Sequence, residues 1–181
     1  MPRLQPVTTD SENAAAAEVL KSVEKKLGVV PNVIATMANS PAVAKAYLGF
    51  SQALAGGALP ARLREQLALV VGETNSCDYC VAAHTALGQK AGLSEQEATD
   101  ARRAAADDER ERAVLRFAQQ IVRERGWVSD EDVQQVREAG ISDGEITEIV
   151  ANVALNLFTN YLNHVAQTEV DFPAAPQLAT T

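Results

Sequence analysis

The sequence predicts an all-α protein, a compact bundle of about eight helices in a single domain over residues 1–181. Hydrophobic residues make up 46% of the chain and aromatic residues only 4%, and alanine is abundant, which favours helices packed closely through small side chains. Apolar residues recur at helical spacing, and no segment has the alternating pattern of a strand. The two ends, residues 1–11 and 174–181, are expected to be irregular.

Start and stop signals for helices follow one another through the first half of the chain. Gly28 ends the first helix, and Ser40 with Pro41 is an N-cap followed by a proline at the first helical position. Ser76 is placed to cap the helix that carries both cysteines, and Gly92 is placed to stop it. The helices expected in this half cover residues 12–27, 31–38, 41–54, 60–75 and 76–91.

The second half of the chain has similar signals. Three serines are each followed, three residues later, by an acidic residue, which is the pattern of a capping box or its acidic equivalent at the start of a helix. These pairs are Ser94 with Glu97, Ser129 with Asp132, and Ser142 with Glu145. Between them, residues 109–125 form an amphipathic stretch that Gly126 ends.

One spacing suggests a degenerate internal repeat of a helix pair. Glu65 and His84 are 19 residues apart, and so are Glu145 and His164, although the second copy has no cysteines. Coincidence among capping glutamates and surface histidines explains the spacing equally well, because repeat architectures match at more positions than these.

Charge and hydropathy exclude two classes of partner. The chain has 16 basic and 24 acidic residues, a net charge of -8, and no basic run that could follow a phosphate backbone, so nucleic acid is not expected as a partner. No apolar stretch approaches the ~20 residues of a membrane-spanning helix, and no apolar signal core is visible near the N-terminus. We therefore expect a cytoplasmic protein, and in that compartment paired cysteines are catalytic or metal-binding candidates.

The candidate site is Cys77-Asp78-Tyr79-Cys80 followed by His84. The chain has two cysteines and two histidines, and three of these four residues fall between positions 77 and 84. On a helix, Cys77, Cys80 and His84 share one face, so the two sulfurs can meet. In the first turn, unpaired N–H groups and the helix dipole stabilise a thiolate, and motifs of this type lower a thiol pKa from ~8.5 to ~7 or below. The pattern predicts a dithiol redox centre.

Glu65 is the candidate carboxylate partner of His84. An unbroken helix would separate Glu65 from Cys77 by roughly 18 Å, so the chain must turn near residues 75–76. An antiparallel helix pair then brings Glu65 opposite His84, where a carboxylate can orient the imidazole for proton transfer. Glu73 is a competing carboxylate, but it lies at the turn, where solvation or capping accounts for it.

The cysteines have two alternative roles. Cys77, Cys80 and His84 offer three metal ligands, but structural zinc usually needs a fourth, for which only His164 or a carboxylate is available. Two inert core cysteines are the other alternative. We expect neither a metal nor a bound cofactor.

The spacing of these residues resembles the signature of the alkyl hydroperoxidase D (AhpD) family, part of the all-helical carboxymuconolactone decarboxylase superfamily. In that signature, eleven residues separate Glu65 from Cys77, two separate Cys77 from Cys80, and three separate Cys80 from His84. The resemblance extends over most of the chain, from about residue 27 to residue 173, and the sequence that flanks the motif is typical of uncharacterised peroxidase-related members. It implies that Cys80 is the peroxidatic thiolate, that Cys77 resolves the sulfenic acid into a disulfide, and that Glu65 and His84 form the proton relay. Tyr79 occupies a position where the best-known member has histidine; it can donate a hydrogen bond but is a weak base, and it serves equally well as a pocket wall.

The predicted function is a cofactor-free thiol peroxidase that reduces alkyl hydroperoxides or hydrogen peroxide. An external dithiol reductant, a lipoyl-bearing protein in the family's namesake, must reopen the disulfide. Two alternatives stay open: a decarboxylase-like lyase, whose relatives typically lack the dithiol, and a non-enzymatic redox sensor or binding protein. The resemblance also implies a homo-oligomer, commonly a trimer or hexamer, with the active site near a subunit contact.

Overall fold

The computed structural model describes residues 1–178, and over them the chain has nine α-helices and no strand. The predicted all-α class is confirmed, with one helix more than the approximate count. The predicted C-terminal tail is irregular as far as residue 178, and residues 179–181 lie outside the described part. The helices are α1 (Ala14–Leu27), α2 (Asn32–Met37), α3 (Pro41–Ala55), α4 (Ala61–Thr74), α5 (Asp78–Lys90), α6 (Glu95–Arg102), α7 (Glu109–Arg123), α8 (Asp130–Glu138) and α9 (Asp143–Ala166).

The helices begin and end largely where local chemistry predicts. Ser94, Ser129 and Ser142 each accept the N–H of the third helical residue, whose carboxylate accepts the N–H of the serine in return, so all three capping boxes are confirmed. Gly28 ends α1 in the left-handed conformation, with φ of 79°, and donates its N–H to the carbonyl of Glu24 at 2.8 Å.

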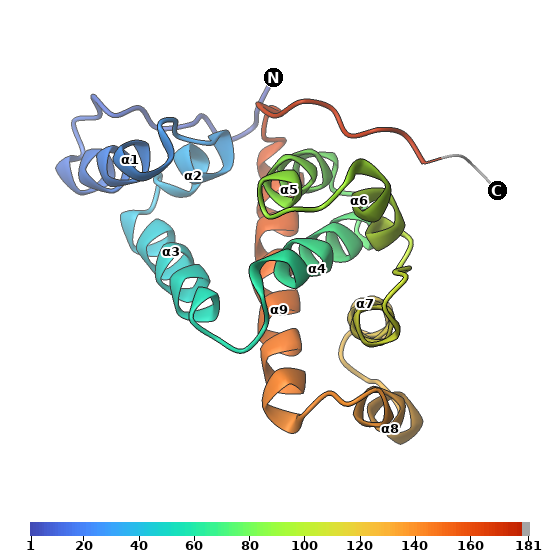
Figure 1. Cartoon of the computed structure of the whole chain (residues 1–181). Helices are drawn as coiled ribbons and strands as arrows, with labels where there is room; N and C mark the ends of the chain where they lie inside the picture. The colour runs from blue at the N-terminus through green and yellow to red at the C-terminus, as the bar shows by residue number, and fades with distance from the viewer. Residues whose placement is uncertain (179–181) are drawn as a thin grey trace.

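The long helix α9 runs through the middle of the molecule (Figure 1). It contacts the N-terminal helices α2 and α3 along one flank and α7 along another. It also contacts the antiparallel pair α4 and α5. None of the helices in residues 1–178 combines the length and apolar character needed to cross a membrane.

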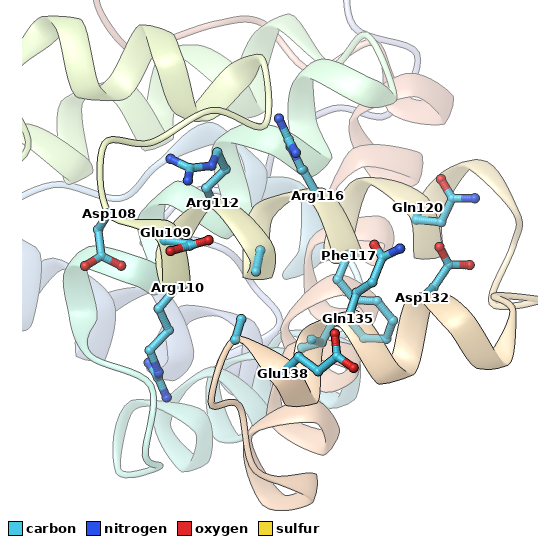
Figure 2. Close-up of a pocket in the computed structure, with 13 residues that line it drawn as sticks. Asp108, Glu109, Arg110, Arg112, Arg116, Phe117, Gln120, Asp132, Gln135 and Glu138 are labelled. Atoms are coloured by element: carbon cyan, nitrogen blue, oxygen red, sulfur yellow. The ribbon is translucent and has the colours of Figure 1, made fainter.

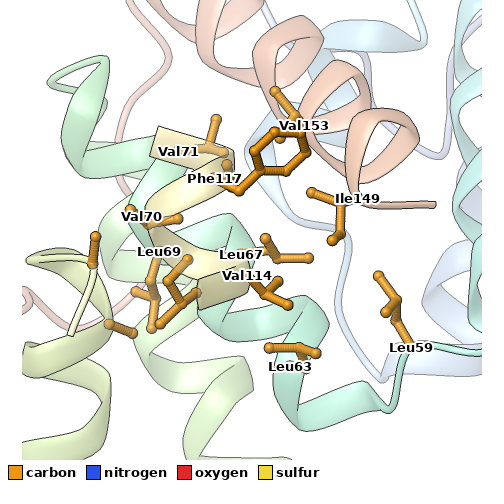
Figure 3. Packing of buried hydrophobic residues seen from close by; sticks show 14 of the residues in the cluster. Leu59, Leu63, Leu67, Leu69, Val70, Val71, Val114, Phe117, Ile149 and Val153 are labelled. Carbon is orange, nitrogen blue, oxygen red and sulfur yellow. The ribbon is translucent and has the colours of Figure 1, made fainter. Parts of the chain in front are cut away.

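The larger of two apolar clusters surrounds α4, whose middle is buried on all sides (Figure 3). Leu67 and Val70 of α4 belong to one cluster with Val114 of α7 and Ile149 and Val153 of α9. Each fully buried aliphatic side chain contributes roughly 1.5–3 kcal/mol relative to an exposed one. This packing gives α4 a fixed place, against which α5 is set.

The second apolar cluster joins the N-terminal helices to the start of α5. Val19 and Val23 of α1 and Ile34 of α2 are buried in the same cluster as Cys77 and Cys80. The N-terminal helices therefore cover the cysteines, and the candidate site lies within this second cluster.

The structure contradicts the possible internal repeat and favours coincidence. Glu145 and His164 both lie on α9, an unbroken helix of 24 residues, so roughly 28 Å of helix separates them. Glu145 is the carboxylate of a capping box, and His164 is exposed in the last turn. No helix pair brings them together as α4 and α5 bring Glu65 and His84 together.

Candidate active site

The two cysteines sit at the turn between α4 and α5. The predicted break is present, but Ser76 is not the cap of α5: it takes the left-handed conformation, with φ of 56°, and Cys77 becomes the N-cap. The N–H of Cys77 donates to the carbonyl of Gly72 at 2.9 Å, and the Cys77 sulfur accepts the N–H of Cys80 at 3.3 Å. The turn thus holds one sulfur directly at the N-terminus of a helix.

Cys77 and Cys80 are joined as a disulfide, with their Cα atoms 5.3 Å apart. Both side chains are buried, at 1% and 2% exposure. They differ in what they face, because Cys80 lines a cavity whose lining does not include Cys77. Of the two cysteines, Cys80 is therefore the one that borders the cavity.

Glu65 and His84 are in contact, as the antiparallel helix pair predicts. The distance from Nδ1 of His84 to Oε2 of Glu65 is 2.8 Å, and about a fifth of each side chain is exposed. Glu73, the competing carboxylate, accepts a hydrogen bond from Nε of Arg102 at 2.7 Å instead. The geometry makes Glu65 the orienting partner of the imidazole; the catalytic role of the pair stays a prediction.

Tyr79 is a buried wall of the site. Its hydroxyl accepts the N–H of Val33 at 3.2 Å, and its ring packs edge-on against Phe172, with centroids 5.8 Å apart. Desolvation raises the pKa of Tyr79 far above its ordinary value, so the phenol stays neutral. These contacts tie α2 and the C-terminal segment to α5, and Tyr79 remains only a predicted participant in catalysis.

A cavity of about 280 Å³ opens beside Cys80 and His84. Its lining is mainly apolar, with Lys26 and His84 as the basic groups. Desolvation, and then the charge of Glu65, raise the pKa of the lining residue Tyr47 to about 12. The other lining residues are Val23, Leu27, Pro31, Val33, Ile34, Leu48, Ser51, Tyr79, Ala83, Leu87, Thr159, Asn163 and Phe172.

A larger hollow of about 740 Å³ lies between α7 and α8, away from the cysteines (Figure 2). Charged side chains such as Arg112, Arg116 and Glu138 surround it, and its lining contains neither cysteine nor histidine. The smaller apolar cavity is therefore the candidate active site.

Sequence reasoning missed Asn163 as a member of the site. This buried side chain of α9 donates from Nδ2 to the sulfur of Cys80 at 3.3 Å, and the same nitrogen is 3.9 Å from the sulfur of Cys77. A signal was present in the sequence, because five polar residues of α9 recur at helical spacing and share one face, which is buried. They are Asn152, Asn156, Thr159, Asn160 and Asn163.

A metal site requires a set of ligating side chains that lie together. Within residues 1–178, no group of three or more His, Cys, Asp or Glu side chains is arranged to hold a metal ion. The expected absence of metal and cofactor stays a prediction.

Comparison with known proteins shows which family the site region resembles and which structures share the fold. Residues 41–120, which include Glu65, both cysteines and His84, match the model of the carboxymuconolactone decarboxylase family. The crystal structure of an alkylhydroperoxidase AhpD core, an uncharacterized peroxidase-related protein from Ralstonia eutropha JMP134, is similar over 94% of this chain and 92% of its own, with 26% identity and a TM-score of 0.84. The fold is thus AhpD-like, and residues 41–120, which carry the candidate site, match the carboxymuconolactone decarboxylase family.

Two further structures share the AhpD-like fold at lower identity. An uncharacterized peroxidase-related protein from Silicibacter sp. TM1040 has 24% identity and a TM-score of 0.80, covering 92% of this chain and 90% of its own. The debrominase Bmp8, solved in complex with 2,3,4-tribromopyrrole, has 22% identity and a TM-score of 0.79, covering 93% and 91%. Among curated proteins, none is similar enough in sequence to count as a relative.

Proposed function

We propose that this AhpD-like protein is a thiol peroxidase that reduces organic hydroperoxides or hydrogen peroxide without a bound cofactor. The observation that carries the proposal is the position of Cys80: it lines an apolar cavity, its disulfide partner Cys77 is one helical turn away, and His84, which is paired with Glu65, lines the same cavity. This arrangement supports the assignment of Cys80 as nucleophile, Cys77 as resolving thiol and the His84–Glu65 pair as proton relay.

The reaction begins from the reduced dithiol. His84, oriented by Glu65, accepts the proton of the Cys80 thiol, and the thiolate attacks the terminal oxygen of the hydroperoxide. The S–O bond forms as the O–O bond breaks, and the leaving alkoxide takes the proton from His84 to become an alcohol. Cys77 then attacks the sulfenic sulfur, the S–S bond forms, and the oxygen leaves as water with the proton of the second thiol.

An external reductant must restore the dithiol. A second dithiol attacks the protein disulfide, passes through a mixed disulfide and is itself oxidised, so two electrons enter for each peroxide reduced. A lipoyl-bearing or other dithiol protein fits this chemistry, and a reducing compartment such as the cytoplasm would supply it.

The test is peroxide consumption by the purified protein with a dithiol reductant. Cys80→Ser is expected to abolish turnover, whereas Cys77→Ser is expected to permit attack but to accumulate sulfenic acid, detected by a sulfenic-acid-specific probe. Far-UV circular dichroism controls for folding. Equal peroxide consumption by the parent and Cys80→Ser would refute the proposal.

A second candidate is reductive dehalogenation at the same dithiol. The apolar lining and the volume of about 280 Å³ suit a small halogenated ring, and a debrominase shares the fold. Bromide release from a brominated pyrrole, measured in the same assay, would favour this candidate. Stoichiometric thiol oxidation without sustained turnover would favour a redox sensor, and carbon dioxide release from a lactone acid would favour a lyase.

A further inference from the structure

The nearest hydrogen-bond donor differs between the two sulfurs of the disulfide, although Nδ2 of Asn163 is also 3.9 Å from the sulfur of Cys77. The sulfur of Cys77, the N-cap, accepts the N–H of Cys80, so the helix N-terminus serves the sulfur that does not line the cavity. For the sulfur of Cys80, the only hydrogen bond within residues 1–178 comes from Nδ2 of Asn163, at 3.3 Å. The cavity-facing sulfur therefore depends on a side chain of α9 rather than on the helix dipole.

We propose that Asn163 is a catalytic residue that donates its side-chain amide to the Cys80 sulfur and stabilises it as the attacking thiolate. The inference rests on the proposed function, in which Cys80 is the nucleophile. It assigns the thiolate at Cys80 a donor that the helix N-terminus does not supply.

The position of Asn163 is held from both sides. Its backbone carbonyl accepts the N–H of Thr168 at 3.2 Å, where α9 ends. One turn earlier, Oδ1 of Asn160 accepts Nδ2 of Asn75 at 2.8 Å, which fixes α9 to the α4–α5 turn. The amide of Asn163 is thus pre-positioned against the dithiol.

The side chain also carries an unsatisfied group that packing alone would not select. Asn163 is 5% exposed, and within the described residues its buried Oδ1 has no hydrogen-bond partner. An unpaired buried carbonyl oxygen opposes folding, whereas an apolar residue of similar size would avoid that penalty. The donor end of the amide supplies a reason for asparagine at this position.

The amide of Asn163 and the N–H of Cys80 act at different steps of the proposed reaction. A hydrogen bond to the charged form favours ionisation, so the amide of Asn163 supports the Cys80 thiolate before it attacks peroxide. When an external dithiol later attacks the sulfur of Cys80, the S–S bond breaks and Cys77 leaves as the thiolate. The N–H of Cys80 at the helix N-terminus supports that leaving group.

The test measures thiolate formation directly, in a Cys77→Ser background that leaves one thiol. The rate of alkylation by iodoacetamide is followed against pH, and its midpoint reports ionisation of Cys80. Asn163→Leu is expected to raise the midpoint by about one pH unit, because a hydrogen bond to a charged group is lost. Asn163→Asp, close to isosteric, is expected to raise it further, because a carboxylate repels the thiolate.

Asn156→Leu is the matched control. Asn156 is a buried asparagine of the same helix, and its amide donates to the carbonyl of Asn152 rather than to a sulfur. Its alkylation midpoint should stay at the parent value.

An unchanged midpoint in folded Asn163→Leu would overturn the inference, and if that variant does not fold, an unchanged midpoint in Asn163→Asp would do so. Alkylation requires no peroxide. If the midpoints shift but no variant or parent consumes peroxide, the inference about Asn163 stands and the proposed function fails.

Discussion

At the scale of single residues, the Glu65–His84 contact should decide proton transfer. Glu65→Gln keeps the shape of the side chain but removes the charge that faces Nδ1 of His84. Loss of an orienting carboxylate typically lowers activity by about 10–100-fold. We expect a decrease of this order in kcat/KM for hydroperoxide reduction, measured with saturating reductant.

Glu73→Gln is the matched control for this substitution. It makes the same change on the same helix, but Glu73 pairs with Arg102 outside the cavity. Activity should stay close to that of the parent. Equal losses in the two variants would mean that Glu65 acts through the stability of α4 rather than through His84.

The residues of the site could be predicted from the sequence only where they are close in sequence or joined by one turn. Cys77, Cys80 and His84 share one helix face, and one helix break brings Glu65 to His84. Asn163 contacts the sulfur of Cys80 from 83 residues further along the chain. That contact depends on how α9 packs against α5, which local spacing does not encode.

At the scale of helices, the close approach of α4 and α5 depends on Gly72. A Cβ added there would lie 3.3 Å from Cβ of Cys80 and 3.4 Å from Cγ2 of Val81. Alanine favours a helix by about 1 kcal/mol over glycine, but here it must displace the first turn of α5. We expect Gly72→Ala to lose peroxidase activity while its urea midpoint changes little, because propensity offsets crowding.

Gly49→Ala tests the same propensity without crowding. Gly49 lies inside α3, and an added Cβ meets nothing within 4 Å. This variant should be more stable than the parent by about 0.5–1 kcal/mol and equally active. Full activity of Gly72→Ala would show that the helix spacing at the dithiol is not critical.

Helices were predicted well where side chains close their own ends, as the three capping boxes show. Two features differ from the sequence-based expectation, the cap at Ser76 and the possible repeat, because the conformation of the backbone determines both. Ser76 has the composition of a cap, but the turn needs it in the left-handed conformation. The repeat required a break between Glu145 and His164, and the sequence between them contains no proline and no glycine.

At the scale of the whole molecule, alkaline pH should loosen the N-terminal helices from α5. The pKa of Tyr47 is raised to about 12 from 10.0, and that of Tyr79 is raised further. The folded state therefore holds these protons more tightly than the unfolded state. The stabilisation is complete below pH 10 and is lost as pH rises from 10 toward 12, by up to ~1.4 kcal/mol per pH unit and group.

Urea unfolding between pH 9 and 12, together with tyrosinate absorbance, measures this loss. Tyr47→Phe removes one titrating group and should flatten the decline relative to the parent. Parallel declines in the two proteins would show that Tyr47 does not carry it.

The outer face of α9 bears on the predicted oligomer. Val150, Phe158, Tyr161 and Val165 are all exposed and recur at helical spacing, so they form one apolar stripe, with Tyr161 at 57% and Val165 at 62% exposure. The stripe lies on the helix that supplies Asn163 to the site. We propose that a second copy of the chain covers it, in line with the homo-oligomer that the family resemblance implies.

Light scattering after size-exclusion chromatography tests this assembly. The parent should elute with the mass of a trimer or hexamer, and Val165→Glu should shift the population toward single chains, because a carboxylate would be buried without a partner. Gln89→Glu adds the same charge at an exposed position of α5 and should leave the mass unchanged. A parent protein that elutes as a single chain would show that the chain does not assemble. A Val165→Glu variant with the mass of the parent would show that the subunit contact lies elsewhere. If dissociation also slows peroxide turnover, the assembly supports the α9 side of the active site.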